Sequence, residues 1–381
     1  MPFKNNQYRT PLISAWIGKG NYGDELMALN LRALLHESFG VQQVDYFQSG
    51  SFGVTPGPQV SVRCLRSSPV SFYQKLTSYY AVPNHDLLLY GGGSIFHSES
   101  SIEWKHRLLQ RYRTSGKRKP AGAIGVSTGP FPTEAAYARC AAFFDELDFI
   151  VCRDAESAKT AATMTSPNKV SLCGDPALLT PLFFKDKMPD PTKRDPELVG
   201  VSFVRLKNDS GVFQARNLAD VFLQIINELL QSKKRVRLFT LYTSEDMRDG
   251  ELNLWLKSNA VDPGRVEIHT FNGDVFHALK KINDCSLMIS MRLHALITAY
   301  MLNIPCLSIA YNPKNHNFMR MISGADVLSL DWNSPDLSVK AIHALRNQCI
   351  ATRNTIQPTL FNTNNIKNVI TNALTIQQPV K

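Results

Sequence analysis

The sequence LISAWIGKGNYGDE, residues 12–25, joins an apolar run to a glycine-rich turn and the start of a helix. Residues 12–17 fit a buried strand, and an amphipathic helical pattern follows over residues 24–38. A strand that passes through glycines into a helix is how a doubly wound α/β domain begins. We therefore predict that the N-terminal domain has this architecture.

The same alternation of short apolar runs and helical patterns continues along the chain. Strands are predicted at residues 12–17, 43–47, 86–90, 121–127, 149–152 and 170–172, and again at 199–204, 236–241, 266–271, 286–290, 305–309 and 326–330. These runs are apolar on both faces, as in a parallel sheet that helices cover on both sides. Residues 49–82 have no clear period and are expected to form an irregular insertion, or a loop with a short helix.

The segment TPLFFKDKMPDPTKRDPEL, residues 180–198, contains four prolines and charges of both signs, which is typical of a linker. The sequence thus predicts an N-terminal α/β domain over residues 1–180, a linker over 181–198, a second α/β domain over 199–335 and a helical tail over 336–381. Two doubly wound, Rossmann-like domains are expected, with the ligand between them at the carboxyl ends of the strands.

Composition and charge limit the class of protein. The 381 residues are 44% hydrophobic and 19% charged, which fits globular domains, and no apolar run or N-terminal signal predicts membrane spanning or secretion. Seven cysteines without a C-x-x-C pair indicate reduced thiols in a cytoplasmic protein. The net charge of +10 favours an anionic partner: phosphate, an acidic saccharide, a membrane surface or nucleic acid. No RNA-binding aromatic motif accompanies the basic runs, so we expect no nucleic acid.

The glycine-rich turn matches the G-x-G-x-x-G pattern of dinucleotide-binding proteins. However, Asp24 and Glu25 would place two carboxylates at the helix N-terminus, where a pyrophosphate would have to bind. This argues against a dinucleotide. Two readings remain: a glycine turn with Asp24 as the helix N-cap, or a loop whose backbone N–H groups and Asn21 meet a polyol or phosphate.

Two further motifs follow predicted strands. Gly91, Gly92 and Gly93 come directly after residues 87–90, and three successive glycines let a backbone approach a ligand closely, whereas a sharp turn needs only one. Arg292 and His294 follow residues 286–290 and open the helix predicted at 293–302. A cation at a helix N-terminus opposes the helix dipole, so this position of Arg292 indicates an anion in front of it.

Two other arginines also end predicted strands. Arginine binds carboxylate and phosphate groups through two parallel N–H donors, so Arg205 and Arg153 suggest a small ligand with several negative charges. Arg153 fits a structural ion pair equally well, and Asp175 is placed to orient one of these arginines.

Taken in order, these motifs resemble those of the polysaccharide pyruvyl transferases. The matching segments are G-N-Y-G-D-E at residues 20–25, G-G-G-S-I-F-H at 91–97, R-D-x-x-S at 153–157, D-P-A at 175–177, S-x-R-L-H-x-L-I-x-A at 290–299, Pro305, and Y-N-P-K at 311–314. The resemblance implies a GT-B-like arrangement with an interdomain cleft. It also implies phosphoenolpyruvate as donor, a sugar diol of a glycan or lipid-linked saccharide as acceptor, and the release of phosphate. Such a protein would be cytoplasmic, with peripheral contact at the inner membrane face.

The resemblance also assigns residues. Catalysis is expected of His294, Arg292 and Asp24, and donor binding of Arg292, Leu293 and His294, with Arg205 and Arg153 as candidates for a further contact. The expected acceptor-binding residues are Gly20, Asn21, Gly23, Asp24, Gly91, Gly92, Gly93, Ser94 and His97, the last of which fits a structural role equally well. Neither a metal nor a cofactor is expected, because the sequence has no D-x-D or H-x-x-H cluster and phosphoenolpyruvate serves as co-substrate.

Two other classes of function stay open. A nucleotide-sugar glycosyltransferase would have the same two-domain architecture and would usually hold the base or ribose with a carboxylate. A non-catalytic protein that binds anions or glycans would take up phosphoenolpyruvate or a saccharide without releasing phosphate.

Overall fold

The computed structural model describes residues 8, 10–48, 61–66, 79–96, 98–114, 119–206, 218–243, 249–323, 329–346 and 363–375. The chain forms two compact units. Unit 1 comprises Met1–Lys19, Asp24–Phe183 and Phe361–Lys381, and unit 2 comprises Gly20–Gly23 and Phe184–Leu360. The glycine-rich segment near the N-terminus therefore belongs to the second unit, although unit 1 surrounds it in the sequence.

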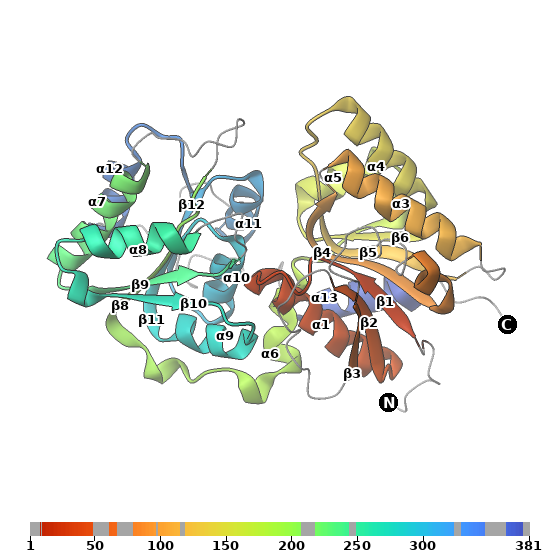
Figure 1. Ribbon diagram of the computed structural model, residues 1–381, viewed down its shortest axis with the longest axis horizontal. Coiled ribbons are helices and arrows are strands. Elements are labelled where there is room, and N and C mark those ends of the chain that lie inside the picture. The colour runs from red at the N-terminus through yellow and green to blue at the C-terminus, as the bar shows by residue number, and fades with distance from the viewer. Residues whose placement is uncertain are drawn as a thin grey trace. The chain divides into compact units, whose positions relative to one another are not determined.

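Unit 1 contains a parallel sheet of seven strands in the order β3-β2-β1-β4-β5-β6-β7 (Figure 1). Its strands are β1 (Pro11–Ser14), β2 (Gln43–Gln48), β3 (Ser61–Arg66), β4 (Leu87–Phe96), β5 (Ala121–Thr128), β6 (Phe149–Cys152) and β7 (Val170–Leu172). Its helices are α1 (Tyr22–Phe39, of which Asp24 onward lies in this unit), α3 (Glu99–Arg113), α4 (Glu134–Glu146), α5 (Ala155–Ala162), α6 (Thr180–Phe183) and α13 (Thr363–Thr375).

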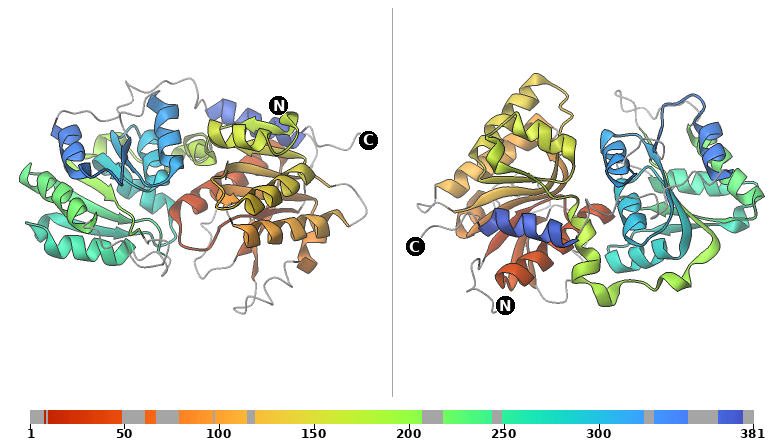
Figure 2. Two further views of the ribbon diagram at one scale, coloured as in Figure 1. Left: turned by 90° about the horizontal axis from the view of Figure 1, so that it is seen from above. Right: turned by 180° about the vertical axis from the view of Figure 1, so that it is seen from behind.

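Helices cover both faces of this sheet, as the two views of Figure 2 show. On one face, Leu88 and Tyr90 of β4 pack with Phe143 of α4 and Leu109 of α3 in a buried apolar cluster. On the other face lies α1. Period-2 alternation in the strands and period-3.6 spacing in the helices supply both apolar layers.

Unit 2 contains a parallel sheet of six strands in the order β10-β9-β8-β11-β12-β13. Its strands are β8 (Asp195–Ser202), β9 (Arg235–Thr240), β10 (Val266–Thr270), β11 (Cys285–Ser290), β12 (Cys306–Ala310) and β13 (Ser329–Asp331). Its helices are α7 (Leu218–Gln231), α8 (Asp249–Asn259), α9 (Val275–Asn283), α10 (Leu293–Met301), α11 (Pro313–Ser323) and α12 (Leu337–Arg346).

In each sheet the strand that comes first in the sequence lies in the interior, and the later strands are added on both sides of it. In unit 1 the order reverses between β1 and β4, and in unit 2 between β8 and β11. Beyond the carboxyl ends of two such strands the connections diverge and leave a crevice, which is where doubly wound sheets bind ligands. Of the four strands at these two points, β1 precedes the glycine-rich turn, β8 precedes Arg205, β11 precedes Arg292, and β4 contains Gly91, Gly92 and Gly93.

The predicted doubly wound α/β fold is confirmed, and the differences are local. The segment expected to be irregular contains the edge strand β3, α5 and α11 were not predicted, and α13 lies within the predicted helical tail. Residues 180–198 are not a plain loop, because α6 ends at Phe183, short 3-10 turns follow, and β8 begins at Asp195. The tail divides: α12 packs on α7 in unit 2, whereas α13 lies in unit 1, where the hydroxyl of Tyr8 donates to the carbonyl of Leu374 at 3.0 Å.

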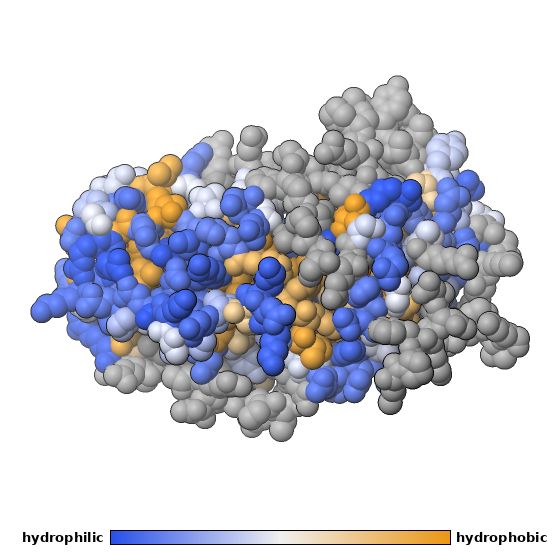
Figure 3. All heavy atoms as spheres, turned by 90° about the horizontal axis from the view of Figure 1, so that it is seen from below, coloured by the Kyte–Doolittle hydropathy of each residue, from blue (hydrophilic) through white to orange (hydrophobic). Residues whose placement is uncertain are grey.

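The surface is that of an ordinary globular chain. Figure 3 shows hydrophilic residues over much of the face that it draws, interspersed with apolar patches. Isolated exposed apolar residues are normal in globular proteins. Five cysteines are buried free thiols, namely Cys140, Cys152, Cys173, Cys285 and Cys306. Of the described helices, none is both long and apolar enough to cross a bilayer.

Candidate functional site

In unit 2, Arg205 and Arg292 follow the two strands at which the sheet order reverses. Ser202 of β8 pairs with Ser290 of β11, and the backbone N–H of Met291 donates to the carbonyl of Ser202 at 2.9 Å. The two strands therefore end level with each other, and both arginines lie at the same edge of the sheet. This confirms the placement of both residues at strand ends.

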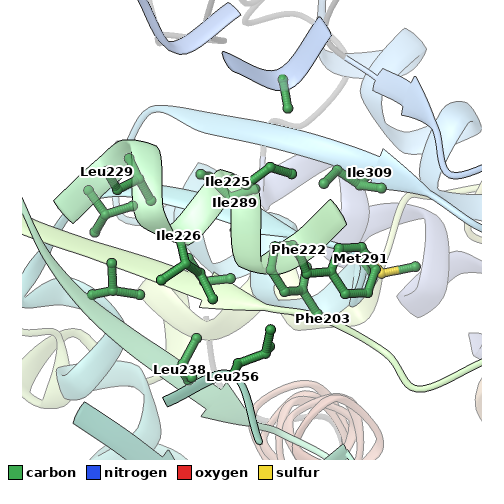
Figure 4. Close-up of a cluster of buried hydrophobic side chains, with 14 of the residues drawn as sticks. Phe203, Phe222, Ile225, Ile226, Leu229, Leu238, Leu256, Ile289, Met291 and Ile309 are labelled. Atoms are coloured by element: carbon green, nitrogen blue, oxygen red, sulfur yellow. The ribbon is translucent and has the colours of Figure 1, made fainter. Parts of the chain in front are cut away.

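Apolar packing holds the backbone that precedes each arginine. Phe203 is buried and stacks on Phe222 of α7, with ring centroids 4.0 Å apart, and Met291 lies beside this pair (Figure 4). The backbone N–H of Val204 points at Sδ of Met291, 3.4 Å away. The positions of the two arginines thus depend on a packed core rather than on a loose loop.

Asp249, in the first turn of α8, connects the two arginines. Its Oδ2 accepts from Nε of Arg292 at 3.1 Å and also from Nη2, so the guanidinium is held by two hydrogen bonds. Its Oδ1 accepts from the backbone N–H of Arg205 at 3.1 Å. The Asp249 carboxylate is almost completely buried and is the positioning group of this site. The side chain of Arg205 pairs with Glu251.

Arg292 is the N-cap residue of α10, and its side chain does not cap the helix. Instead the guanidinium lies over the ring of Tyr242, 5.3 Å from the ring centroid, in the geometry of a cation–π contact. Burial lowers the pKa of Arg292, but Tyr311 and Asp249 outweigh burial and raise it. Arg292 is therefore a fixed cation at the positive end of a helix, which is the arrangement expected in front of an anion.

Tyr311 and Lys314 come from the segment after β12, and Tyr311 forms a hydrogen bond with Arg292. Burial raises the pKa of the Tyr311 phenol, but Lys314 and Arg292 outweigh burial and bring the pKa below its ordinary value. Asn315, which is fully buried in the first turn of α11, donates Nδ2 to the carbonyl of Met291 at 2.7 Å. This hydrogen bond fixes the start of α11 against the residue that precedes Arg292.

The segment Gly20–Gly23 is bound within unit 2 on two sides. On one side, the backbone N–H of Tyr22 donates to the carbonyl of Leu241 at 3.0 Å, and that of Thr243 donates to the carbonyl of Gly20 at 3.0 Å. On the other side, the hydroxyl of the buried Tyr22 lies 2.9 Å from Oγ1 of Thr298 in α10. Residues 20–23 of the first motif and the S-x-R-L-H-x-L-I-x-A motif at residues 290–299 therefore lie together in unit 2.

His294 lies in the first turn of α10 and packs against Gly23. A Cβ atom at position 23 would overlap the imidazole ring, with Nδ1 as its nearest atom. Oγ1 of Thr298 donates to the carbonyl of His294 at 2.7 Å. Hydrogen bonds therefore connect Tyr22 to Thr298 and Thr298 to the backbone of His294. Leu293, the other residue expected at the donor, has a buried side chain.

Two expectations for the glycine-rich turn need correction. Asn21, not Asp24, occupies the N-cap position of α1, because the helix begins at Tyr22 and Oδ1 of Asn21 accepts from the backbone N–H of Gly23 at 3.1 Å. In addition, Gly20, Asn21 and Gly23 were expected on the side of the N-terminal domain and instead belong to unit 2. Spacing along the chain does not reveal that a short segment belongs to a different unit from the residues on either side of it.

In unit 1, the three successive glycines of β4 lie under α1. A Cβ at Gly91 would meet Leu31, and one at Gly92 would meet Met27. At Gly93 a Cβ would lie 3.0 Å from Oδ1 of Asp24. All three glycines are buried, so close packing of the helix on the strand accounts for them sterically. Contact of this backbone with an acceptor stays a prediction.

Ser94, which follows the glycines and is partly exposed, belongs to a hydrogen-bond network around Arg153. The Arg153 side chain donates to Oγ of Ser94 at 3.2 Å, to Oγ of Ser127 at 2.7 Å and to Oδ2 of Asp175 at 3.3 Å. It is 4% exposed and joins the ends of β4, β5 and β6 to the turn after β7. Of the two readings of Arg153, this geometry favours the structural ion pair. His97 lies outside the described residues.

Sequence reasoning did not single out Asp249 or Tyr242. Asp249 is the first residue of α8, where a carboxylate complements the helix dipole. Tyr311 and Lys314 were visible in the Y-N-P-K motif but had no assigned role. In the parts of the chain that are described, no group of three or more His, Cys, Asp or Glu side chains is placed to hold a metal ion.

Comparisons with known proteins agree with the sequence motifs. A family model described as polysaccharide pyruvyl transferase matches residues 21–313, a range that runs from the first motif to the start of Y-N-P-K. A search of curated proteins finds no match.

Solved structures share the fold at low sequence identity. The UDP-GlcNAc 2-epimerase of Methanocaldococcus jannaschii is 11% identical, with a TM-score of 0.62, and the match covers 97% of this chain and 99% of that one. A UDP co-structure of MnaA from S. aureus is 10% identical, with a TM-score of 0.61 and coverage of 98% and 99%. The UDP-N-acetylglucosamine 2-epimerase of Rickettsia bellii is 10% identical, with a TM-score of 0.60 and coverage of 97% of each chain. These likenesses show a fold of the GT-B type with two Rossmann-like units.

Proposed function

The chain belongs to the polysaccharide pyruvyl transferase family, and from that premise we propose that it transfers the pyruvyl group of phosphoenolpyruvate to a sugar diol. The products are a cyclic pyruvate ketal and phosphate. The family makes the chain an enzyme that transfers pyruvyl groups in polysaccharide biosynthesis. The donor, its binding residues and the form of the acceptor are the parts that we propose.

The observation that carries the proposal is the Arg205–Asp249–Arg292 arrangement in unit 2. Phosphoenolpyruvate has a carboxylate and a phosphate, so its binding needs cations in defined orientations. Asp249 fixes Arg292 at the positive end of α10 and holds the backbone of Arg205 at the same sheet edge. Lys314 adds a third cation near Tyr311. We propose that Arg292 and His294 bind the donor, with Arg205 rather than Arg153 as the further arginine.

The chemistry needs a proton donor and fixed positive charge. A proton added to the methylene carbon C3 makes C2 an oxocarbenium-like centre, which the first sugar hydroxyl attacks. The bond from C2 to the phosphate oxygen then breaks, and the second hydroxyl closes the ring. Of the two protons released by the hydroxyls, one balances the proton consumed at C3 and the other leaves with phosphate. Arg292 would stabilise the departing charge, and His294 would bind or protonate the phosphate.

We propose that the acceptor is a glycan or a lipid-linked saccharide bound through unit 1. Asp24 lies at the start of α1 over Gly93, next to the point at which the sheet order reverses, and Ser94 is partly exposed nearby in sequence. Asp24 would accept the proton of a sugar hydroxyl. Asp24→Asn is expected to lower acceptor turnover and to spare phosphoenolpyruvate binding, whereas equal loss of both would contradict this role.

The net charge of +10 supports a peripheral contact with an anionic membrane surface at the cytoplasmic face, where a lipid-linked acceptor would be available. Sedimentation with vesicles that contain anionic lipid, compared with neutral vesicles, tests this part. Binding that is independent of vesicle charge would contradict it.

Phosphate release from phosphoenolpyruvate is the direct test of the function. The protein is incubated with phosphoenolpyruvate and acceptors that contain galactose, glucose or N-acetylmannosamine, and both phosphate and an acid-labile pyruvate ketal are measured. Release that depends on one acceptor supports the proposal. Donor binding without release would indicate a binding protein. Stabilisation by UDP or another nucleotide, with no release from phosphoenolpyruvate, would indicate a nucleotide-sugar glycosyltransferase.

A further inference from the structure

Tyr311 is the first residue after β12 and lies at the sheet edge that carries Arg292. Ser290 of β11 pairs with Ser308 of β12, so the two strands end level with each other. The hydrogen bond from Asn315 to the carbonyl of Met291 holds the start of α11 at this edge. Tyr311 is therefore set in place by the register of the sheet and by the anchored helix that follows it.

Three charged groups from three different elements face the Tyr311 phenol. Arg292, at the start of α10, forms a hydrogen bond with it, Lys314 approaches from α11, and Asp249 approaches from α8. Two of these groups are cations and one is an anion. Tyr311 is only partly exposed. A neutral acid in such a position gives up its proton more readily, because the phenolate is stabilised by two positive charges.

We propose that Tyr311 is a catalytic residue, the acid that protonates C3 of phosphoenolpyruvate; this inference rests on the proposed function. The phenolic O–H bond breaks as the C3–H bond forms, and the phenolate that remains lies beside Arg292 and Lys314. The phenolate then takes the proton of the first sugar hydroxyl as the oxygen of that hydroxyl bonds to C2. Asp24 accepts the proton of the second hydroxyl, and that proton then leaves with phosphate, so Tyr311 ends the cycle protonated and no further reagent is consumed.

Electrostatics favours Tyr311 over His294 for this step. His294 lies in the first turn of α10, and its ring packs against Gly23. An imidazolium acid would add a further cation to a site that already contains Arg292 and Lys314. A phenol is neutral before it gives up its proton and anionic afterwards, and the neighbouring cations stabilise that anion. His294 then binds the phosphate and delivers to it the proton with which it leaves.

The test is Tyr311→Phe, which keeps the ring and removes the acid. We expect kcat for phosphate release to fall about a hundredfold or more, the range of general acid catalysis. The affinity for phosphoenolpyruvate, measured separately by calorimetry, should change only a few-fold. Tyr137→Phe is the matched control, because it removes one phenol from α4 of unit 1, and it should keep wild-type kcat. Thermal unfolding of both variants checks that each is folded.

A substrate-free measurement separates this inference from the proposed function. A titration of phenolate absorption in the near ultraviolet should show a tyrosine that ionises earlier than the others in wild type and in Tyr137→Phe, and that is missing in Tyr311→Phe. If this early titration is absent, or if Tyr311→Phe keeps near-normal kcat while the wild type is active, the inference on Tyr311 is wrong and the proposed function stands. If the wild type releases no phosphate from phosphoenolpyruvate with any acceptor, the proposed function is wrong, whatever the titration shows.

Discussion

Gly23 and His294 lie in such close contact that a side chain at position 23 would occupy the space of the imidazole ring. The two residues are 271 positions apart in the sequence, and both belong to unit 2. The glycine-rich turn near the N-terminus therefore holds His294, a residue of the proposed donor site, in position. This relationship leads to the first prediction.

Gly23→Ala should lower phosphate release at least tenfold, because the methyl group must displace His294 from its position, and misplacement of a catalytic group by about 1 Å can cost a hundredfold. Rates are measured at saturating phosphoenolpyruvate. Gly264→Ala is the matched control, since its Cβ would find only an ordinary contact, 3.4 Å from Asp262. Equal activity of the two variants would mean that the position of His294 is unimportant.

Arg292→Lys should fail although it keeps the charge. Lysine cannot reproduce the two hydrogen bonds to Asp249 or the planar contact with Tyr242, so the cation would no longer be oriented. Loss of a contact of this kind costs about 2–4 kcal/mol in the transition state, or roughly a hundredfold or more in rate. The measurement is kcat/KM for phosphoenolpyruvate. A variant within threefold of wild type would show that charge alone is sufficient.

His294→Gln should lower turnover more than donor binding. Glutamine still donates a hydrogen bond toward an anion, but it cannot exchange a proton near neutral pH. Both kcat and the dissociation constant for phosphoenolpyruvate are measured across the pH range. Near-normal kcat with a raised KM at every pH would make His294 a binding residue alone.

We expect substitution of Arg205 to affect donor binding and substitution of Arg153 to affect stability. Arg205→Ala is expected to raise KM for phosphoenolpyruvate with little change in unfolding, because its side chain pairs with Glu251 in a partly exposed position. Arg153→Ala removes one partner of a buried ion pair, a change that typically costs about 3–5 kcal/mol of stability. Chemical unfolding and donor kinetics are compared for the two variants. The reverse pattern would make Arg153 the donor contact.

Glu25 makes unit 1 sensitive to pH. Burial raises the pKa of its carboxyl from 4.5 to about 7, although the N–H of Gly18, 2.6 Å from Oε1, and the charge of Arg32 oppose this. Between these two pKa values the folded state binds more protons than the unfolded state, so the free energy of unfolding falls as pH rises from 4.5 to about 7.

Glu25→Gln removes this titration and keeps an oxygen that can accept from Gly18. At pH values above 7 the variant should be more stable than wild type by roughly 1–3 kcal/mol, and near pH 4 the two should be equal. Denaturant unfolding as a function of pH measures the difference, with Glu134→Gln, an exposed carboxyl at the start of α4, as control. A constant difference across pH would show that Glu25 does not titrate in this range.

Much of the architecture follows from local patterns in the chain. The apolar runs that became β5, β6 and β11 are buried over most of their length, and short-range periodicity is sufficient to identify such strands. Arg292 was placed correctly at a strand end because it follows an apolar run and precedes an apolar helical pattern. The edge strand β3 was missed, since a short strand at the edge of a sheet carries little apolar pattern.

Only the tertiary structure assigns partners across long distances in the chain. Asp249 is one of many carboxylates in the sequence, and its role appears only when α8 brings it to Arg292, 43 positions away. Gly91, Gly92 and Gly93 suggested a ligand until α1 was seen to pack on them, and Gly20–Gly23 was assigned to the unit that surrounds it in the sequence. Periodicity reports which face of an element is buried, because burial repeats with the geometry of that element. It does not report which other element covers that face, because that choice depends on the packing of the whole chain.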